Sequence, residues 1–177
     1  VIDTKNQLIG LRNPLAAVDL GGIAVGWTID RAVAVLRDCG IMAAFINHGG
    51  DAYALGIPEE SDGWVVGIPD PDHPEETIHN MTLHNEAIAT SGNYHRFVLI
   101  GHRRFGHILD PRSGKPDSEL LSMTVVARTA LEADAFSTGL FCLGMKEAAP
   151  AFSKPLRAIW VERQDNRPIL REMAKRD

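Results

Sequence analysis

Asp134 and Thr138 are candidate metal ligands, because they lie four residues apart in a segment with a helical pattern. This spacing places a carboxylate and a hydroxyl on one helix face. Both groups are hard oxygen ligands, which suit Mg²⁺ better than zinc. Their neighbours are mostly apolar, and an uncompensated charge is expensive to bury. The spacing therefore predicts a Mg²⁺ site, with two alternatives: Asp134 pairs with an arginine, or it caps a neighbouring loop.

A glycine-rich loop, with Gly21, Gly22 and Gly26, runs directly into a second helical pattern. Backbone N–H groups at the start of a helix can face an anion such as a phosphate. The glycine spacing matches neither the P-loop nor the dinucleotide-binding fingerprint. Two interpretations therefore stand for this loop: phosphate binding, or a tight turn that packs on a core helix.

His107 differs from the other histidines because it directly precedes the turn at Asp110 and Pro111, at the expected end of a hairpin strand. An imidazole in that place can act as a general base or contact a phosphate, and a structural hydrogen bond is the alternative. The seven histidines show no clustered zinc-ligand spacing. No G-x-S-x-G motif supports a hydrolase nucleophile.

Two helices must position these residues. The first is predicted from apolar residues at i, i+3, i+4 and i+7, and Gly40 is its expected end. The second begins with a T-x-x-E capping box formed by Thr129 and Glu132, and it ends at Gly144. Charged residues such as Asp30 fall off the apolar stripe of the first helix, which consists of Ile29, Ala32, Val33 and Leu36.

Short apolar runs between turn residues predict strands, several of them arranged as hairpins. A short helix at 146–153 and a charged tail are expected after the second long helix. Because strands outnumber helices, the sequence predicts an α+β fold with a mixed, largely antiparallel sheet and packed helices. The expected strands are 41–46, 52–55, 64–68, 77–83, 94–100, 104–109, 121–127 and 157–161.

Length and composition indicate one globular domain over residues 1–177. The net charge of −5 argues against a nucleic-acid partner, and no apolar run is long enough to span a membrane. Cys39 and Cys142 both lie in apolar helical contexts, so we expect buried thiols rather than a disulfide or a ligand pair. A start at Val1 rather than Met indicates a processed or truncated product.

Four blocks of the chain resemble, in the same order, the motifs of the ApbE family of FAD:protein FMN transferases. The segment from Asp19 resembles D-L-G-G-I-A-K-G, and the segment that ends at Asp51 resembles N-x-G-G-D. Residues 89–94 resemble A-T-S-G-x-Y, and residues 107–116 then resemble H-I-x-D-P-x-T-G-x-P. Residues 133–138 resemble A-D-A-x-x-T. The matches extend over most of the chain.

The resemblance implies an ApbE-like (T-fold-like) domain that uses Mg²⁺ to cleave the pyrophosphate of FAD. FMN would pass to a threonine of an acceptor flavoprotein, and AMP would leave. His107 would be the catalytic base for that threonine, and Asp134, Thr138 and the backbone oxygen of Ala24 would bind Mg²⁺. The implied FAD-binding residues are Gly21, Gly22, Asp51, Thr90, Ser91, Gly92 and Asp110.

The sequence departs from the family pattern in three ways. Val25 replaces a lysine that would lie near the phosphates, and Ser113 replaces a threonine but keeps the hydroxyl. Family members also carry a long segment before the first block, and part of the flavin pocket lies in it. We therefore expect a fragment, a shortened branch of the family, or a homo-oligomer or second chain that completes the pocket.

Two alternative functions remain for such a site. Water could replace the threonine, so that FAD yields FMN and AMP as in a pyrophosphatase. The chain could also be a flavin-binding or assembly module without turnover. The resemblance favours an exported setting, either periplasmic or membrane-associated.

Overall fold

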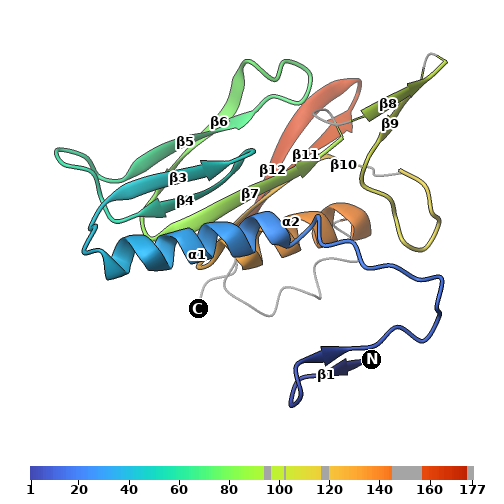
Figure 1. Cartoon of the computed structure of the whole chain (residues 1–177). Coiled ribbons are helices and arrows are strands. Elements are labelled where there is room, and N and C mark those ends of the chain that lie inside the picture. Colours follow the sequence, from blue (N-terminus) through green and yellow to red (C-terminus); the bar gives the residue numbers. More distant parts are fainter. Residues whose placement is uncertain (94–96, 102, 117–119, 145–156, 175–177) are drawn as a thin grey trace.

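The computed structural model of the chain describes residues 1–93, 97–101, 103–116, 120–144 and 157–174. Within these residues, six strands form one sheet in the order β12-β11-β10-β7-β4-β3, and every neighbouring pair is antiparallel (Figure 1). The expected α+β fold is confirmed. The strands are β3 (Ala44–His48), β4 (Asp51–Leu55), β7 (Glu86–Gly92), β10 (Leu120–Ala127), β11 (Arg157–Gln164) and β12 (Arg167–Ala174).

Helices α1 (Ala24–Asp38) and α2 (Ala130–Leu143) pack on one face of this sheet (Figure 1). Ile29 and Val33 of the predicted α1 stripe are buried, and the backbone of Gly40 has a φ of 76° just past the helix end. The Thr129 half of the capping box also forms, since the Glu132 N–H donates to Thr129 Oγ1 at 3.2 Å. The main core lies between α1, α2 and the sheet and includes Met123, Val125, Leu140 and Phe141.

A hairpin of β5 (Trp64–Pro69) and β6 (Thr77–Leu83) covers the opposite face of the sheet. A second apolar cluster fills the space between this hairpin and the sheet. It contains Ala52, Ala54, Ile68, Met81, Leu83, Ile88, Val126 and Ile159. Side chains on one face of the sheet therefore pack against the helices, and those on the other face pack against the β5–β6 hairpin. In β4 and β7, the odd-numbered residues face the helices.

A third hairpin, β8 (Phe97–Ile100) and β9 (Arg103–Gly106), extends away from the sheet (Figure 1). It belongs to the connection between β7 and β10, which are direct neighbours in the sheet. The hairpin was expected, but β9 ends at Gly106, so His107 follows the strand rather than ending it. Gly106 lies directly against Asn93, and a Cβ added to this glycine would collide with the Asn93 side chain.

The charged tail is not a tail, because it forms edge strand β12 and pairs with β11 along its length. Asp165 and Asn166 join the two strands with φ of 48° and 62°. A two-residue turn with positive φ at both positions is the favoured connection of a hairpin. The expected helix at 146–153 lies outside the described residues.

The expectation of two buried thiols is wrong for Cys39, which is exposed at the end of α1, beyond the apolar stripe. Cys142 is half-buried, and both cysteines are free. Among the described residues, no helix is long and apolar enough to cross a membrane.

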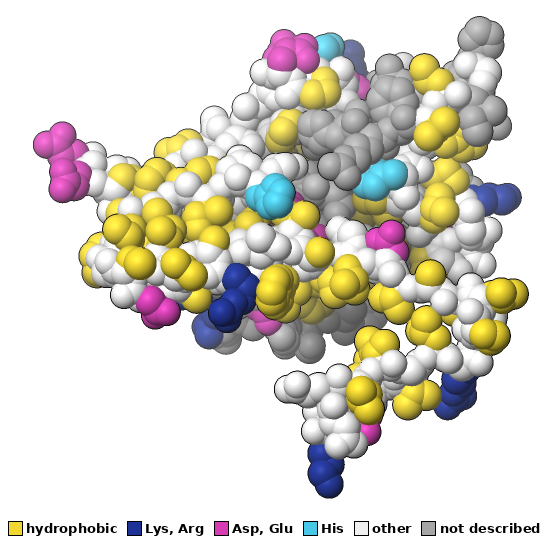
Figure 2. Space-filling model, viewed as in Figure 1, with side chains coloured by type: hydrophobic (Ala, Val, Ile, Leu, Met, Phe, Trp, Pro, Cys, Tyr) yellow, Lys and Arg dark blue, Asp and Glu magenta, His cyan; other side chains and the backbone are white. Residues whose placement is uncertain are grey.

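The segment before α1 lies largely in solvent, with a short hairpin of β1 (Ile2–Asp3) and β2 (Leu8–Ile9) at its start (Figure 1). Figure 2 shows hydrophobic side chains along this segment and along the outward face of α1. The exposed apolar residues there include Leu15, Val18, Leu20, Trp27 and Val35.

Candidate functional site

The N-termini of α1 and α2 are each capped by a carboxylate from the other helix. Asp134 Oδ2 accepts a hydrogen bond of 2.9 Å from the Gly26 N–H in the first turn of α1. Asp30 accepts from the N–H groups of Ala130 and Leu131 at 2.7 and 2.9 Å. The partial positive charge of a helix N-terminus stabilises a carboxylate in this position. The partner of Asp134 is thus the first turn of a neighbouring helix, rather than the arginine or the loop that the two alternatives named.

Gly26 permits the close approach of α1 to α2. A Cβ at this position would collide with the Ala130 carbonyl oxygen and lie 2.8 Å from Leu131 Cα. Glycine is thus required by backbone proximity rather than by a turn. As a result, the first turn of α1 faces the side chains of the first turns of α2.

Thr138 lies one helical turn beyond Asp134 and contacts the glycine-rich loop. A Cβ on Gly22 would stand 3.1 Å from Thr138 Cγ2 and 3.3 Å from its Oγ1. On its other side, Thr138 Oγ1 lies 3.1 Å from Ser91 Oγ, which also bonds Ser137 Oγ at 2.9 Å. The predicted shared face of Asp134 and Thr138 therefore meets both the glycine loop and β7.

Asp51, at the start of β4, adds a second carboxylate to this region. Burial, and then the negative charge of Asp134, raise the pKa of Asp51 to about 7, although a hydrogen bond from the Thr90 backbone lowers it. Burial also raises the pKa of Asp134, against the effect of the Gly26 N–H. Two carboxylates in a poorly solvated region favour a cation between or beside them.

The oxygen atoms in this region fit a small hard cation. Asp134 is 5% exposed and close enough to Asp51 for its charge to raise the pKa of that carboxyl group, while Thr138 contacts Gly22 one turn further along α2. The Ala24 carbonyl, which accepts from Thr28 Oγ1 at 2.8 Å, lies in the same first turn of α1 as Gly26. Carboxylate, hydroxyl and carbonyl oxygens suit Mg²⁺. In the part of the chain that the structure describes, no three His, Cys, Asp or Glu side chains form a metal cluster.

The glycine loop offers fewer unoccupied N–H groups than the sequence suggests. The Gly21 N–H donates to Asp19 Oδ1 at 2.6 Å, and the Gly26 N–H donates to Asp134. Both N–H groups therefore already bind carboxylate oxygens of this chain. Val25, which replaces the family lysine, is partly buried and packs against the main core.

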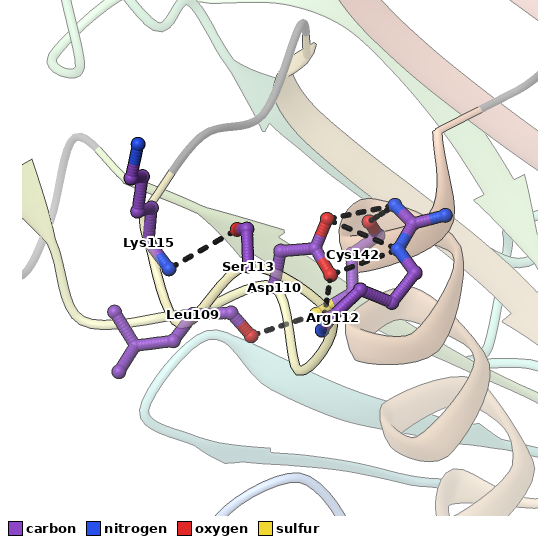
Figure 3. Close-up of polar contacts among 6 residues, drawn as sticks. All are labelled: Leu109, Asp110, Arg112, Ser113, Lys115 and Cys142. Atoms are coloured by element: carbon purple, nitrogen blue, oxygen red, sulfur yellow. Dashed lines mark hydrogen bonds and ion pairs between the residues drawn. The ribbon is translucent and has the colours of Figure 1, made fainter.

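The turn that follows His107 is fastened to the C-terminal end of α2 (Figure 3). Arg112 Nη2 donates to Asp110 Oδ2 at 2.7 Å and to the Cys142 carbonyl at 3.3 Å. Cys142 Sγ in turn donates to the Leu109 carbonyl at 3.7 Å. Hydrogen bonds from Arg112 lower the pKa of Asp110 to about 2. The Asp110 carboxylate thus binds Arg112 within this turn. The backbones of Asp110 and Lys115 pair in an antiparallel β-bridge that joins the two sides of the turn.

This attachment places the His107 turn near the Mg²⁺ candidate residues. Cys142 follows Thr138 by four residues, a rise of about 6 Å along the helix axis. Ile108 packs against the main core, whereas His107 beside it is exposed. The fold therefore presents the imidazole to solvent from a turn whose neighbours are held on both sides.

Among the predicted site residues, the structure places Gly22 and Ser91 against Thr138 and places Asp51 close to Asp134. The Thr90 side chain points to the other face of the sheet, where it bonds Thr124. Asp30 did not stand out in the sequence, because it lies off the apolar stripe of α1 and resembles a solvated residue. Its spacing of four from Gly26 was the available signal, because both then share one face of α1. Ser137 was also missed, and its Oγ bonds Ser91 Oγ at 2.9 Å.

Together, the fold and these contacts define an α+β domain that gathers hard oxygen donors from α1, α2 and two strands of one sheet. The family model described as the ApbE family matches residues 1–160. This chain belongs to the ApbE family, which confirms the resemblance seen in the four sequence blocks.

Named relatives agree with this assignment. A Klebsiella pneumoniae (strain 342) protein named FAD:protein FMN transferase is 34% identical over 174 residues, which are 96% of this chain and 52% of the relative. The protein of that name from Escherichia coli (strain K12) is 32% identical over 146 residues, or 81% of this chain and 42% of the relative. The chain therefore spans about half the length of the curated relatives it matches.

Solved structures agree in the same way. The ApbE protein of Thermotoga maritima superposes with a TM-score of 0.80 and 32% identity, covering 90% of this chain and 53% of the other. The flavin transferase ApbE from Vibrio cholerae gives a TM-score of 0.75 and 28% identity, covering 91% and 51% of the two chains.

Proposed function

We propose that this chain carries the metal site and the catalytic histidine of a Mg²⁺-dependent FAD:protein FMN transferase. The reaction would join FMN to a threonine of an acceptor protein and release AMP. Membership of the ApbE family and the names of the relatives support flavin transfer. The observation that carries the metal assignment is the convergence of Asp134 on Gly26 and of Thr138 on Gly22.

The residues that would hold Mg²⁺ are Asp134, Thr138 and Ala24, the last through its carbonyl oxygen, and Asp51 would contribute negative charge beside them. The bound ion would supply neutralisation of the charge on the pyrophosphate oxygens. The donors come from two helices that are fixed to each other, so little rearrangement would be needed at the moment of reaction. Ser91 at the end of β7 would border the FAD side of the site, because its Oγ contacts Ser137 and Thr138 of α2. Thr90 would take part through its backbone, which hydrogen-bonds Asp51, since its side chain bonds Thr124 on the other face of the sheet.

His107 accepts the proton of the acceptor threonine hydroxyl. The threonine oxygen then forms a bond to the phosphorus of the FMN half, while the bond from that phosphorus to the bridging oxygen breaks. The electron pair leaves with AMP, so one phosphoester replaces one phosphoanhydride. An exposed imidazole suits this role, because a protein substrate must reach it from solvent.

The test incubates the chain with FAD, Mg²⁺ and an acceptor protein that contains the target threonine. Transfer predicts that the acceptor gains the mass of FMN less one water molecule and that an equal amount of AMP appears. Free FMN with AMP would instead indicate a pyrophosphatase, and unchanged bound FAD would indicate a binding module. Asp134→Ala is expected to abolish the Mg²⁺-dependent reaction, and His107→Ala to retain FAD binding without transfer.

A further inference from the structure

Asp30 joins α1 to the first turn of α2 through both of its carboxylate oxygens. Oδ1 accepts from the Ala130 N–H at 2.7 Å, and Oδ2 accepts from the Leu131 N–H at 2.9 Å. These N–H groups have no partner within their own helix, because the first turn lacks preceding carbonyls. Asp30 is half-buried and lies 100 residues before Ala130 in the sequence, so these contacts fix tertiary structure.

The same helix face of α1 holds the proposed metal-binding carboxylate. Gly26 precedes Asp30 by one turn, and its N–H donates to Asp134 at 2.9 Å. Asp134 follows Ala130 by one turn of α2. The first turn of α1, at Gly26, thus binds the second turn of α2, and the second turn of α1, at Asp30, binds the first turn of α2. The Ala24 carbonyl belongs to the first turn of α1.

We propose that Asp30 is a positioning residue that sets the affinity of this site for Mg²⁺. By holding the start of α2 against α1, it fixes the Asp134 carboxylate relative to the Ala24 carbonyl. Metal sites depend on such outer contacts, because ligands displaced by a fraction of an ångström bind less tightly. This inference rests on the metal site of the proposed function.

The test measures Mg²⁺ binding to the full chain by calorimetric titration, with no need for flavin or turnover. Asp30→Ala is expected to weaken Mg²⁺ binding by about tenfold, as is typical for loss of an outer contact. Asp30→Asn keeps one acceptor oxygen and is expected to fall between Asp30→Ala and the unchanged protein. Near-ultraviolet circular dichroism establishes that each variant is folded.

Thr129→Ala is the matched control, because Thr129 also caps the first turn of α2. Its side chain accepts from the Glu132 N–H, within the same helix. We expect this variant to lower the Tm by about 2–4 °C but to bind Mg²⁺ within twofold of the unchanged protein. An equal loss of affinity in Thr129→Ala would overturn the inference, since stability of the helix end would then explain the effect.

A further variant separates this inference from the proposed function. If Asp134→Ala binds Mg²⁺ as tightly as the unchanged protein, the metal assignment itself is wrong. If Asp134→Ala loses binding while Asp30→Ala keeps it within twofold, the positioning role alone is overturned. Should Asp30→Ala not fold, Asp30→Asn decides, with a loss of affinity in support and unchanged affinity against.

Discussion

The ionisation of Asp51 links the candidate site to the stability of the fold. Its pKa rises from an ordinary value of 3.8 to about 7 in the folded state, because burial and the charge of Asp134 penalise the carboxylate. The folded state therefore binds this proton more tightly than the unfolded state. Stability from the neutral carboxyl group is complete below pH 3.8, is lost as the pH rises to about 7, and then stays constant.

We accordingly expect the Tm of the metal-free protein to fall between pH 4 and pH 7 relative to that of Asp51→Asn. The asparagine variant is the control, because it keeps the size of the side chain and cannot ionise. Above pH 7, added Mg²⁺ should raise the Tm of the unchanged protein more than that of Asp51→Asn. Parallel pH curves for the two proteins would contradict the assigned carboxylate pair.

At this scale, sequence reasoning succeeded for residues close in the chain. Asp134 and Thr138 could be paired because helical spacing alone puts them on one face. The approach of Asp51 to Asp134 could not be predicted, since it depends on how β4 and α2 are brought together by the sheet. Asp30 was missed for a related reason, because its partners lie 100 and 101 residues away.

Among the elements, the crossing of α1 and α2 depends on a single glycine. Gly26→Ala places a methyl group against the Ala130 carbonyl, and backbone atoms cannot rotate away as a side chain can. We expect this substitution to lower the free energy of unfolding by about 1–3 kcal/mol, measured by urea denaturation.

Gly139→Ala provides the comparison for Gly26→Ala. Gly139 lies inside α2, and a Cβ there would meet nothing within 4 Å. Gly139→Ala should raise the free energy of unfolding by about 0.5–1 kcal/mol, because alanine is more stable than glycine inside a helix. If both variants were equally stable, steric contact between the helices could not explain the glycine at position 26.

The attachment of the His107 turn to α2 is a second contact between elements, and it should affect FMN transfer. Arg112→Ala removes the bond to the Cys142 carbonyl and the ion pair with Asp110. We expect FMN transfer to fall about tenfold or more because the imidazole is less well placed, while Mg²⁺ affinity stays within twofold. Transfer is measured by the mass gain of the acceptor, and Mg²⁺ binding by calorimetric titration.

Arg171→Ala is the matched control for Arg112→Ala. Its ion pair with Glu162 lies between β11 and β12, and the two arginine side chains are 48% and 49% exposed. Loss of this surface pair should leave both measurements unchanged. Equal loss of transfer in the two variants would mean that Arg112 has no special relation to His107.

For the whole molecule, the sequence indicated the fold class but not the order of the strands. A hairpin pattern predicts that consecutive strands pair. Strand β7, however, pairs with β10, and the long connection between them contains β8, β9 and the His107 turn. Strand β12 was missed because its charged residues mask a strand pattern. The Asp165–Asn166 turn was the local signal for it, since both residues tolerate positive φ.

Because each helix N-terminus is capped by a carboxylate from the other helix, local unfolding of one end should be coupled to unfolding of the other. Neither end can be exposed to solvent alone, since the Gly26 amide is held from α2 and the Ala130 and Leu131 amides are held from α1. Native-state hydrogen exchange should therefore show these three amides protected by similar opening free energies. Asp30→Ala should also speed the exchange of the Gly26 amide, which Asp30 does not touch. If that rate were unchanged, the helix ends would open separately.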